Sequence, residues 1–491
     1  MAKRIQDKRN LTMLVDFYEL TMANGYWKHG MQEVECVFDM FFRTIPDKGG
    51  YAIMAGLEQL IEYLRDLHFT EEDIEYLRGR GCFDEGFLSY LRDFRFSCDV
   101  WAVPEGTPVF PHEPIVIVRG PAIQAQLVET MVLLSINYPS LVATKSARIN
   151  RAAEGRAVME FGSRRAQSYD AAVLGARAAY IGGCGATACT VVDEQYGVPA
   201  VGTMAHSWVQ IFDSEYEAFC AYAETYPDSC TLLVDTYDVL RSGVPNAVRV
   251  FNEIVVPSGH RPAGIRIDSG DIAYLSKQAR AMLDAAGFPD CKIVASNSLD
   301  EYLIRDLLQQ GAQIDSFGVG ENLITAKSNA VFGGVYKLVA VRENGELQGR
   351  IKLSESIEKV TTPGFKHVYR LFDRETGKAH ADLVMLEGER IDETQPLTVF
   401  DPNAIWKQTT LTNFRAESLL KPIFEKGNLV YDLPKLSEIR DRCRAGLESM
   451  WPEVLRFENP HGYYVDLSEK LWRLKNEMIL RQKNVDDPFT K

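Results

Sequence analysis

Cysteine pairs at metal-binding or disulfide spacing are missing from this chain. Its 491 residues contain nine cysteines, an odd number, and no two of them form a Cys-x-x-Cys pair. We therefore expect reduced and mostly buried thiols, and we exclude a disulfide framework or a zinc site built from such pairs. Excess positive charge is missing too, because the net charge is −14. This argues against a general nucleic-acid or anionic-membrane surface, although a local basic pocket for a phosphate is compatible with it.

Long hydrophobic segments are also absent. The apolar run at 128–142 is interrupted by Glu129, Asn137 and Pro139, and it is too short to cross a bilayer. The first ten residues are polar and lack the apolar core of a secretory signal. The sequence thus predicts a cytoplasmic protein with no membrane partner and no nucleic-acid partner.

The patterns that are present predict an α/β protein of two or three domains. Apolar residues at helical spacing predict a helix over 11–30, and strand-like runs at 33–43 and 98–120 complete an α+β opening section. Past residue 400 the chain looks helical and charged. Between these parts, from about residue 140, short β-rich runs alternate with helix-like segments. The runs are 157–161, 179–181, 198–201, 231–234, 264–267, 292–295, 314–319 and 335–341.

This series of βα units fits a parallel barrel or an open doubly wound sheet. We favour the barrel because polar side chains follow many different strands rather than one switch point. The run at 264–267 is followed by the most distinctive of these groups. Arg266 and Asp268 are two residues apart, so they share one face of a strand, where each needs a partner or a ligand. We favour a substrate contact over a structural ion pair. For Asp271, at the start of the next helix, an N-cap and a ligand role are both open.

His206 lies in a turn of small residues after the run at 198–201. A lone histidine in this place is more often structural, but a position on the same rim as Arg266 favours an active-site role. Its neutral imidazole can accept a phosphoryl group from ATP or act as an acid or base. Asp235 ends another strand, where it either orients a magnesium-bound water or caps a helix.

Phe161 ends the run at 157–161, and Arg164 follows it. The ring offers a face to a flat substrate and the guanidinium a charge to a carboxylate or phosphate, while a core ring and a surface arginine are an equally open alternative. Glycine pairs near the late strands allow backbone amides to approach a phosphate, although turns need glycine as well. These pairs are Gly318 with Gly320 and Gly333 with Gly334.

Seven segments, in one order, resemble the nicotinate phosphoribosyltransferase family. They are the stretch at 14–27, EFGSRRAQ at 160–167, GTMAHS at 202–207, LVDTYD at 233–238, RIDSGD at 266–271, ASNSLDE at 295–301 and GGVYKLV at 333–339. The resemblance implies a type II phosphoribosyltransferase fold, in which an irregular α/β barrel joins an open-faced α/β sandwich. On this basis we expect the sandwich at 1–135, the barrel with the active site at 136–345, a return segment on the sandwich at 346–400 and a helical C-terminal extension at 401–491.

The resemblance also implies a reaction of NAD salvage. Nicotinate and 5-phosphoribosyl 1-pyrophosphate (PRPP) give nicotinate mononucleotide and pyrophosphate, and hydrolysis of the co-substrate ATP is coupled through phosphorylation of His206. Mg²⁺ enters with the phosphates rather than in a metal site of its own. The enzyme is expected to be a homodimer in which Tyr18 reaches the neighbouring subunit's site.

The candidate site residues, taken from the residue patterns and the resemblance together, fall into three groups. Catalytic roles go to His206, Asp235 and Asp268; nicotinate contacts go to Tyr18, Phe161, Thr203 and Arg266; PRPP and phosphate contacts go to Arg164, Asp271, Gly318, Gly320, Gly333 and Gly334.

Two departures from the family pattern bear on these roles. Glu321 follows Gly320 where many relatives carry threonine or serine, and it would repel a phosphate unless it turns away or meets a cation. The segment 182–189 lacks the acidic residue of nicotinamide-using relatives, which favours nicotinate. Nicotinamide and quinolinate phosphoribosyltransferases remain alternatives, as does a non-catalytic paralogue that senses a metabolite.

Overall fold

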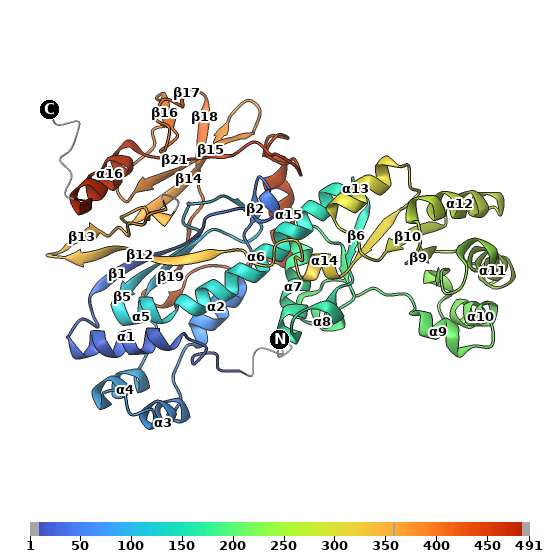
Figure 1. Ribbon diagram of the computed structural model, residues 1–491, viewed down its shortest axis with the longest axis horizontal. Coiled ribbons are helices and arrows are strands. Elements are labelled where there is room, and N and C mark those ends of the chain that lie inside the picture. The colour runs from blue at the N-terminus through green and yellow to red at the C-terminus, as the bar shows by residue number, and fades with distance from the viewer. Residues whose placement is uncertain (1–8, 357–358, 484–491) are drawn as a thin grey trace. The chain divides into compact units, whose positions relative to one another are not determined.

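The computed structural model describes residues 9–356 and 359–483. The chain start at 1–8, on which part of the expected lack of a secretory signal rests, lies outside the described residues. Two compact units make up the chain (Figure 1). Unit 1 holds the residues up to Leu141 and those from Val331 onward, and unit 2 holds 142–330. The four-part division expected from the resemblance stays a prediction.

Unit 1 is built on β-sheets with mainly antiparallel pairing. Its largest sheet has the strand order β13-β12-β1-β5-β3-β19-β20, and a second has the order β18-β14-β15-β21. The first comprises β13 (Glu346–Gly349), β12 (Gly334–Glu343), β1 (Glu35–Phe42), β5 (Val116–Pro121), β3 (Asp99–Ala102), β19 (Lys421–Glu425) and β20 (Asn428–Leu429). The second comprises β18 (Phe414–Ser418), β14 (Lys366–Asp373), β15 (Ala379–Leu386) and β21 (Tyr464–Leu467), and two small ribbons pair β16 (Leu397–Phe400) with β17 (Gln408–Leu411) and β2 (Ala52–Ile53) with β4 (Pro108–Val109).

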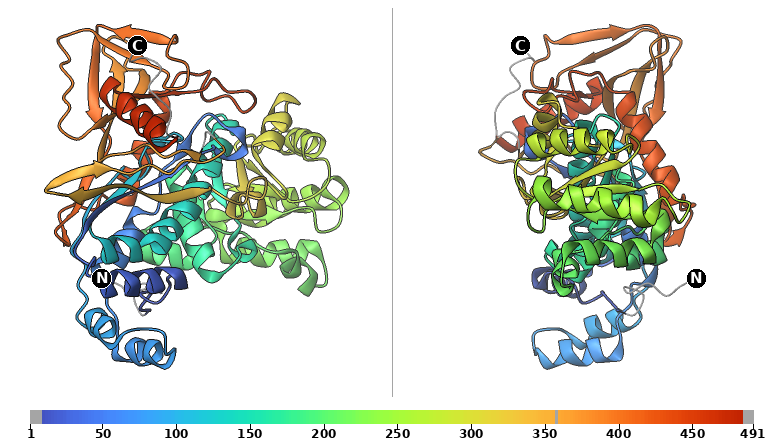
Figure 2. Two further views of the ribbon diagram at one scale, coloured as in Figure 1. Left: turned by 60° about the vertical axis from the view of Figure 1, so that its left-hand side comes forward. Right: turned by 90° about the vertical axis from the view of Figure 1, so that its right-hand side faces the viewer.

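Helices cover these sheets. In Figure 1, α1 lies beside α5 below the large sheet, and the α3–α4 pair projects from the edge of unit 1, light blue in both views of Figure 2. The predicted helix at 11–30 is present but begins later, at Phe17. The helices of unit 1 are α1 (Phe17–Lys28), α2 (Leu57–Asp66), α3 (Glu71–Gly79), α4 (Glu85–Arg92), α5 (Ala122–Leu127), α15 (Leu436–Glu448) and α16 (Glu469–Lys483).

The segment past residue 400 corrects one prediction. It contains α15 and α16, but also five strands, β17 to β21, so it is not a helical extension. β19 pairs with β3, more than 300 residues earlier, and its Ile423 and Phe424 are buried. The local charge pattern revealed the two helices, whereas the strands are stabilised by partners far away in the sequence. This segment is therefore an integral part of unit 1.

Unit 2 contains a sheet of six parallel strands in the order β7-β6-β11-β10-β9-β8. Five of them match predicted runs. Parallel strands place their carboxyl ends at one edge, so side chains that follow different strands come together there. The strands are β7 (Ala186–Thr187), β6 (Ala157–Glu160), β11 (Ser316–Val319), β10 (Lys292–Ser296), β9 (Gly264–Ile267) and β8 (Thr231–Leu233).

Two of the eight predicted strands are wrong, and a third is a strand but belongs to unit 1 instead of the parallel series. Residues 179–181 lie in α7, because a short alanine-rich apolar run fits a buried helix as well as a strand. Residues 198–201 form only a single bridge, between Ala200 and Thr187. Residues 335–341 belong to β12, which pairs antiparallel with β1 in unit 1. The helices of unit 2 are α7 (Tyr169–Ile181), α8 (Thr190–Tyr196), α9 (His206–Ile211), α10 (Glu215–Thr225), α11 (Val244–Val250), α12 (Ile272–Ala285), α13 (Glu301–Gln309) and α14 (Glu321–Ile324).

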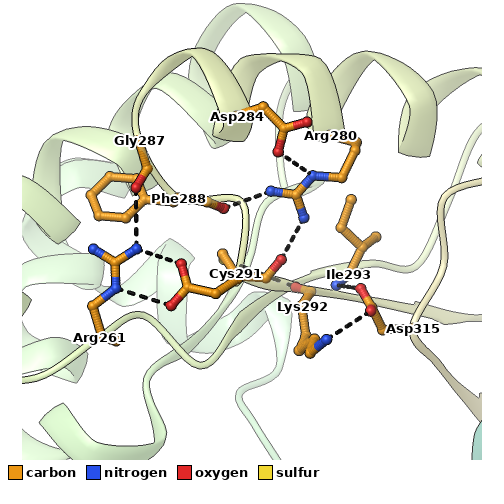
Figure 3. A network of polar contacts seen from close by, with 10 residues as sticks. Arg261, Arg280, Asp284, Gly287, Phe288, Cys291, Lys292, Ile293 and Asp315 are labelled. Atoms are coloured by element: carbon orange, nitrogen blue, oxygen red, sulfur yellow. Dashed lines mark hydrogen bonds and ion pairs between the residues drawn. The ribbon is translucent and has the colours of Figure 1, made fainter.

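Ion pairs and carbonyl contacts hold the amino ends of the strands in unit 2 (Figure 3). Arg280 of α12 donates to Asp284 and to the carbonyl oxygens of Phe288 and Cys291, which tie the end of α12 to the start of β10. Asp315 accepts from the backbone N–H of Ile293, 2.9 Å away. These contacts lie at the edge of the sheet formed by the amino ends of the strands. In barrel-like sheets, residues at this edge usually stabilise the fold, and catalytic residues lie at the opposite edge.

The longest helical stretch, Ala122–Ala152, joins α5 to α6 (Glu129–Ala152). By length and composition alone it is apolar enough to cross a membrane, but 67% of its apolar window is buried inside the protein. A core helix passes the same test, so this stretch gives weak support for a membrane span.

Candidate active site

Candidate side chains lie in a row along the carboxyl edge of the parallel sheet. The register pairs Ile267 of β9 with Ala295 of β10, and Ser296 of β10 with Gly318 of β11. Asp268 and Ser296 are the next residues along, so the register sets them side by side. Five adjacent strands, β8, β9, β10, β11 and β6, thus bring residues from 160 to 320 into one region of unit 2.

Arg266 and Asp268 form the centre of this region. Ile265 and Ile267 are fully buried on the other face of β9, as the alternation predicts. The Arg266 Nη2 donates to Asp268 Oδ1 at 2.9 Å, and its Nε donates to Ser296 Oγ at 2.8 Å. Ser296 in turn donates a short hydrogen bond to Asp268 Oδ1. The arginine and the aspartate are therefore held by each other and by one serine.

His206 begins α9 and lies next to this centre. Its Nδ1 is 3.1 Å from Thr236 Oγ1, and its Nε2 is 3.8 Å from Asp268 Oδ2. Asp235 accepts from the backbone N–H of Asp268 at 3.1 Å through Oδ2. Its other oxygen, Oδ1, is buried and has no hydrogen-bond partner among the described residues. The imidazole Nε2 thus faces a carboxylate, and Asp235 supports the loop that carries that carboxylate.

Phe161 lies over Gly318, which has no side chain to obstruct it. A Cβ at position 318 would lie 2.5 Å from the ring of Phe161, so only glycine leaves this space. The Arg266 guanidinium carbon lies 5.6 Å from the centre of the same ring, within the range of a cation–π contact. Gly320 serves close packing too, because a Cβ there would lie 3.2 Å from the carbonyl oxygen of Phe161. An aromatic ring and a cation therefore lie next to each other in this region.

Glu160 anchors the loop that carries the ring. It is fully buried and accepts from Thr187 Oγ1 at 2.7 Å and from the backbone N–H of Gly162. Burial raises the pKa of this carboxyl, and the hydrogen bond from Thr187 opposes that shift. The buried carboxyl fixes the turn that follows β6.

The predicted phosphate residues of unit 2 have mixed surroundings. Asp271 caps α12, accepting from the backbone N–H of Tyr274 at 3.0 Å. Arg164 is exposed in the short turn after Phe161. Glu321 forms a 2.7 Å ion pair with Lys327, whose hydrogen bond lowers the pKa of that carboxyl. The carboxylate that departs from the family pattern thus has a cation of its own.

Tyr18, Gly333 and Gly334 belong to unit 1. Tyr18 lines a cavity of about 340 Å³ together with Glu129 and Lys337, whose charged groups are 3.9 Å apart. Partial burial and the Glu129 carboxylate raise the pKa of the Tyr18 hydroxyl. A Cβ at Gly334 would lie 2.2 Å from Asn137 Oδ1, and Gly333 has a φ of +74°. Packing and backbone conformation alone explain these two glycines, and their phosphate contacts stay predictions.

Sequence reasoning missed two polar residues of the site. Ser296 and Thr236 lie within segments that carry the family resemblance, but a serine or threonine there is too common to stand out. Both occupy the end of a parallel strand or the turn after it, where a hydroxyl can reach its neighbours. That position is the signal that could have identified them.

Comparisons with known proteins now identify the family. Models of the nicotinate phosphoribosyltransferase (NAPRTase) family match the chain in three parts: its N-terminal domain at residues 13–137, the family model itself at 156–354 and its C-terminal domain at 365–475. The chain belongs to the nicotinate phosphoribosyltransferase family. The family segment at 156–354 includes Phe161, His206 and Arg266, so the central part of the candidate site lies within the matched region.

Individual relatives in the family match over nearly their whole length. The nicotinate phosphoribosyltransferase of Bacillus subtilis is 45% identical over 477 residues, which is 97% of this chain and 96% of that protein. The human nicotinate phosphoribosyltransferase is 32% identical over 96% of this chain and 97% of its own.

Solved structures agree. The crystal structure of human nicotinic acid phosphoribosyltransferase has a TM-score of 0.83 and 30% identity, and it covers 95% of this chain and 100% of its own. A nicotinate-nucleotide pyrophosphorylase from Pyrococcus furiosus has a TM-score of 0.70 at 22% identity over 91% of this chain and 98% of its own, and it shares the fold.

Proposed function

We propose that this protein transfers the phosphoribosyl group of PRPP to nicotinate, as a step of NAD salvage. The products are nicotinate mononucleotide and pyrophosphate. The observation that carries this proposal is the arrangement around Arg266, whose cation borders the face of Phe161. A pyridine ring that bears a carboxylate needs both features, and full-length relatives are named for this activity.

Nicotinate binds with its ring against Phe161 and its carboxylate on Arg266. The Arg266 Nη1 has only a weak contact, 3.4 Å from Thr203 Oγ1, so it is able to donate to a ligand. The guanidinium side chain is 17% exposed, and charge-assisted hydrogen bonds strengthen where water is largely excluded. Nicotinamide has no negative charge to receive this cation, which is why we propose nicotinate as the substrate.

The ring nitrogen of nicotinate is the nucleophile and needs no general base. It attacks the anomeric carbon of PRPP as the bond to pyrophosphate breaks, through an oxocarbenium-like state. The protein's contribution is to position the reactants and to stabilise charge. Asp268 lies beside Arg266 and faces the developing positive charge, while Arg164, Asp271 and the turns at Gly318 and Gly320 serve the ribose and phosphates.

Mg²⁺ fits this site only as a companion of the substrate phosphates. Among the described residues no group of three or more histidine, cysteine, aspartate or glutamate side chains could hold a metal ion. The buried Oδ1 of Asp235 lacks a partner and suits a hydrogen bond from a metal-bound water. When bound, the ion would neutralise phosphate charge, and Asp235 would accept a hydrogen bond from one of its waters.

His206 accepts a phosphoryl group from ATP. The Nδ1 lies near Thr236, which leaves Nε2 on the side of Asp268 to attack the γ-phosphorus with release of ADP. Water later cleaves the phosphorus–nitrogen bond and releases phosphate. One turnover then converts nicotinate, PRPP, ATP and water into nicotinate mononucleotide, pyrophosphate, ADP and phosphate.

The finer architecture belongs to the same proposal. Unit 2, with its six parallel strands, corresponds to the irregular α/β barrel of a type II phosphoribosyltransferase, and unit 1 corresponds to the open-faced sandwich. Two chains form a homodimer in the cytoplasm, and Tyr18 of each completes the partner's site. The 47% exposure of Tyr18 and 46% exposure of Phe17 on α1 support this assembly, because large aromatic side chains are usually covered.

The test supplies the purified protein with PRPP and Mg²⁺, adds nicotinate or nicotinamide, each with and without ATP, and identifies the products by mass spectrometry. We expect nicotinate mononucleotide, formed faster with ATP and with matching release of ADP. Nicotinamide mononucleotide as the main product would contradict the assignment of the carboxylate to Arg266. No product from either substrate, despite measurable binding, would support a metabolite sensor instead.

A further inference from the structure

Ser296 is the last residue of β10, and its side chain lies between the two central charged groups of the site. The residue is 2% exposed. Its Oγ accepts from Arg266 Nε at 2.8 Å and donates a short hydrogen bond to Asp268 Oδ1. A hydroxyl has one proton to donate, so with Asp268 receiving that proton a lone pair is left to accept from the arginine. Both polar functions of the serine are thus used inside the site.

These bonds occupy one edge of the Arg266 guanidinium. Nε points to Ser296, and Nη2, on the same side of the group, points to Asp268 Oδ1 at 2.9 Å. The guanidinium is a planar fork with a second edge, formed by Nη1 and the other N–H of Nη2. On that edge, the contact to Thr203 Oγ1 is long, at 3.4 Å. A ligand can therefore use the Nη1–Nη2 edge without displacing a strong protein contact.

The serine also prevents Arg266 and Asp268 from forming a closed ion pair. Arginine and a carboxylate side by side favour two parallel N–H···O bonds, one to each oxygen. Here Nη2 donates directly to Asp268 Oδ1, and Nε donates to Ser296, which itself donates to the same oxygen. The second carboxylate oxygen, Asp268 Oδ2, faces His206 at 3.8 Å instead. Without the hydroxyl, Nε would lose its acceptor, and a rotation of the Asp268 carboxylate would give the Nε–Nη2 edge two oxygens. That rearrangement would neutralise more of the arginine's charge.

We propose that Ser296 is a positioning residue that determines specificity for a carboxylate on the pyridine ring. It holds the Nη1–Nη2 edge of Arg266 toward the substrate and keeps the arginine's charge from being used up by Asp268. This inference rests on the proposed function, since it assumes that the ligand of Arg266 is the nicotinate carboxylate. Ser296 therefore contributes to substrate specificity although its own side chain does not contact the substrate.

The test compares Ser296→Ala with Ser296→Thr, which keeps the hydroxyl on a strand that accepts β-branched residues. Ser296→Ala should lower kcat/KM for nicotinate by about 10- to 100-fold, mainly through KM, because a hydrogen bond to a charged group is lost. Use of nicotinamide should change by less than about 3-fold, and Ser296→Thr should retain most of the wild-type activity. Calorimetric titration with nicotinate gives the same comparison without turnover.

A double-mutant cycle separates positioning from a structural role. In an Arg266→Ala background, Ser296→Ala should have almost no further effect on nicotinate use, because the group that it positions is gone. Ser276→Ala is the matched control, since Ser276 is also buried in unit 2 and its hydroxyl bonds two backbone groups, the carbonyl of Ala273 and the N–H of Gln313. This control should leave the preference for nicotinate unchanged. If Ser296→Ala does not fold, Ser296→Cys replaces it, because a thiol is nearly the same size and a poor acceptor.

Three results would overturn the proposal. Equal losses with nicotinate and nicotinamide, or the same fold loss in the presence and absence of Arg266, would mean that Ser296 only supports the structure. Wild-type behaviour of Ser296→Ala with nicotinate would refute it as well, while leaving the proposed function intact. If the unmodified protein does not use nicotinate, the proposed function fails and this inference fails with it.

Discussion

Replacing Arg266 by alanine should separate the two pyridine substrates. In the wild type, the open edge of the guanidinium is expected to donate two hydrogen bonds to the nicotinate carboxylate. Hydrogen bonds to charged groups contribute about 1.5–3 kcal/mol each, so the loss of two should be about 3–6 kcal/mol. Since about 1.4 kcal/mol corresponds to a factor of ten, kcat/KM for nicotinate should fall by roughly 10²- to 10⁴-fold.

Nicotinamide offers a neutral carbonyl oxygen in place of the carboxylate. The charged guanidinium donates a single hydrogen bond to this oxygen, which contributes about 1.5–3 kcal/mol and corresponds to a loss of about 10- to 150-fold. The variant also deprives Asp268 of a cation 2.9 Å away, but this cost falls on both substrates and cancels in their ratio. The ratio of the two kcat/KM values is therefore the informative quantity.

The assay measures initial rates of mononucleotide formation at saturating PRPP for each substrate, in the wild type and in Arg266→Ala. Arg241→Ala serves as a control, because the side chain of Arg241 is 90% exposed on unit 2. Nicotinate use should fall at least ten times further than nicotinamide use in Arg266→Ala, and the control should change neither. Equal losses for both substrates would refute the assignment of the carboxylate to this guanidinium.

Four further variants test other parts of the account. His206→Ala should abolish ATP stimulation and the acid-labile phosphate on the protein, while a slow ATP-independent reaction persists; undiminished stimulation would contradict the phosphate-acceptor role. Tyr18→Ala should lower activity, and mixing it with Arg266→Ala under conditions of verified subunit exchange should restore part of it, whereas no recovery would argue against a site shared by two chains. Gly318→Ala should reduce nicotinate binding by 10-fold or more in a titration, because its Cβ would lie 2.5 Å from the aromatic ring above it; wild-type binding would show that the ring has room to move. Burial raises the pKa of Glu19 to about 8 from 4.5. Between these pH values the folded protein keeps a proton that the unfolded chain releases, so the free energy of unfolding should fall as pH rises, by up to about 1.4 kcal/mol per pH unit. Glu19→Gln should flatten that fall in thermal unfolding measurements, and an unchanged pH dependence would rule out this carboxyl as its source.

Local patterns predicted those parts of unit 2 that local forces determine. The strand at 264–267 alternates buried isoleucines with Arg266, and Asp271 caps the helix that follows, as N-cap preferences lead one to expect. The run at 335–341 looks the same in sequence but pairs antiparallel with β1 in unit 1. Its partner lies about 300 residues away, and no local periodicity identifies such a partner.

The candidate site was predictable where a residue carries charge or an unusual side chain. Arg266, Asp268 and His206 stand out at strand ends, and the structure brings them together. Ser296 does not stand out, because a serine at the end of a strand is common and its two bonds depend on the register of β9 and β10. The contact between Glu321 and Lys327 is likewise a matter of loop geometry, although the two residues are only six apart.

The measurement that tests the central claim most directly is the ratio of kcat/KM for nicotinate to kcat/KM for nicotinamide in the unmodified protein, at saturating PRPP, Mg²⁺ and ATP. A cation on Arg266 that receives a carboxylate should favour nicotinate by about 10-fold or more, from the second charge-assisted hydrogen bond that a carboxylate accepts and a single carbonyl oxygen does not. A ratio near or below one would mean that this guanidinium does not select the substrate, and the account of the site would be wrong.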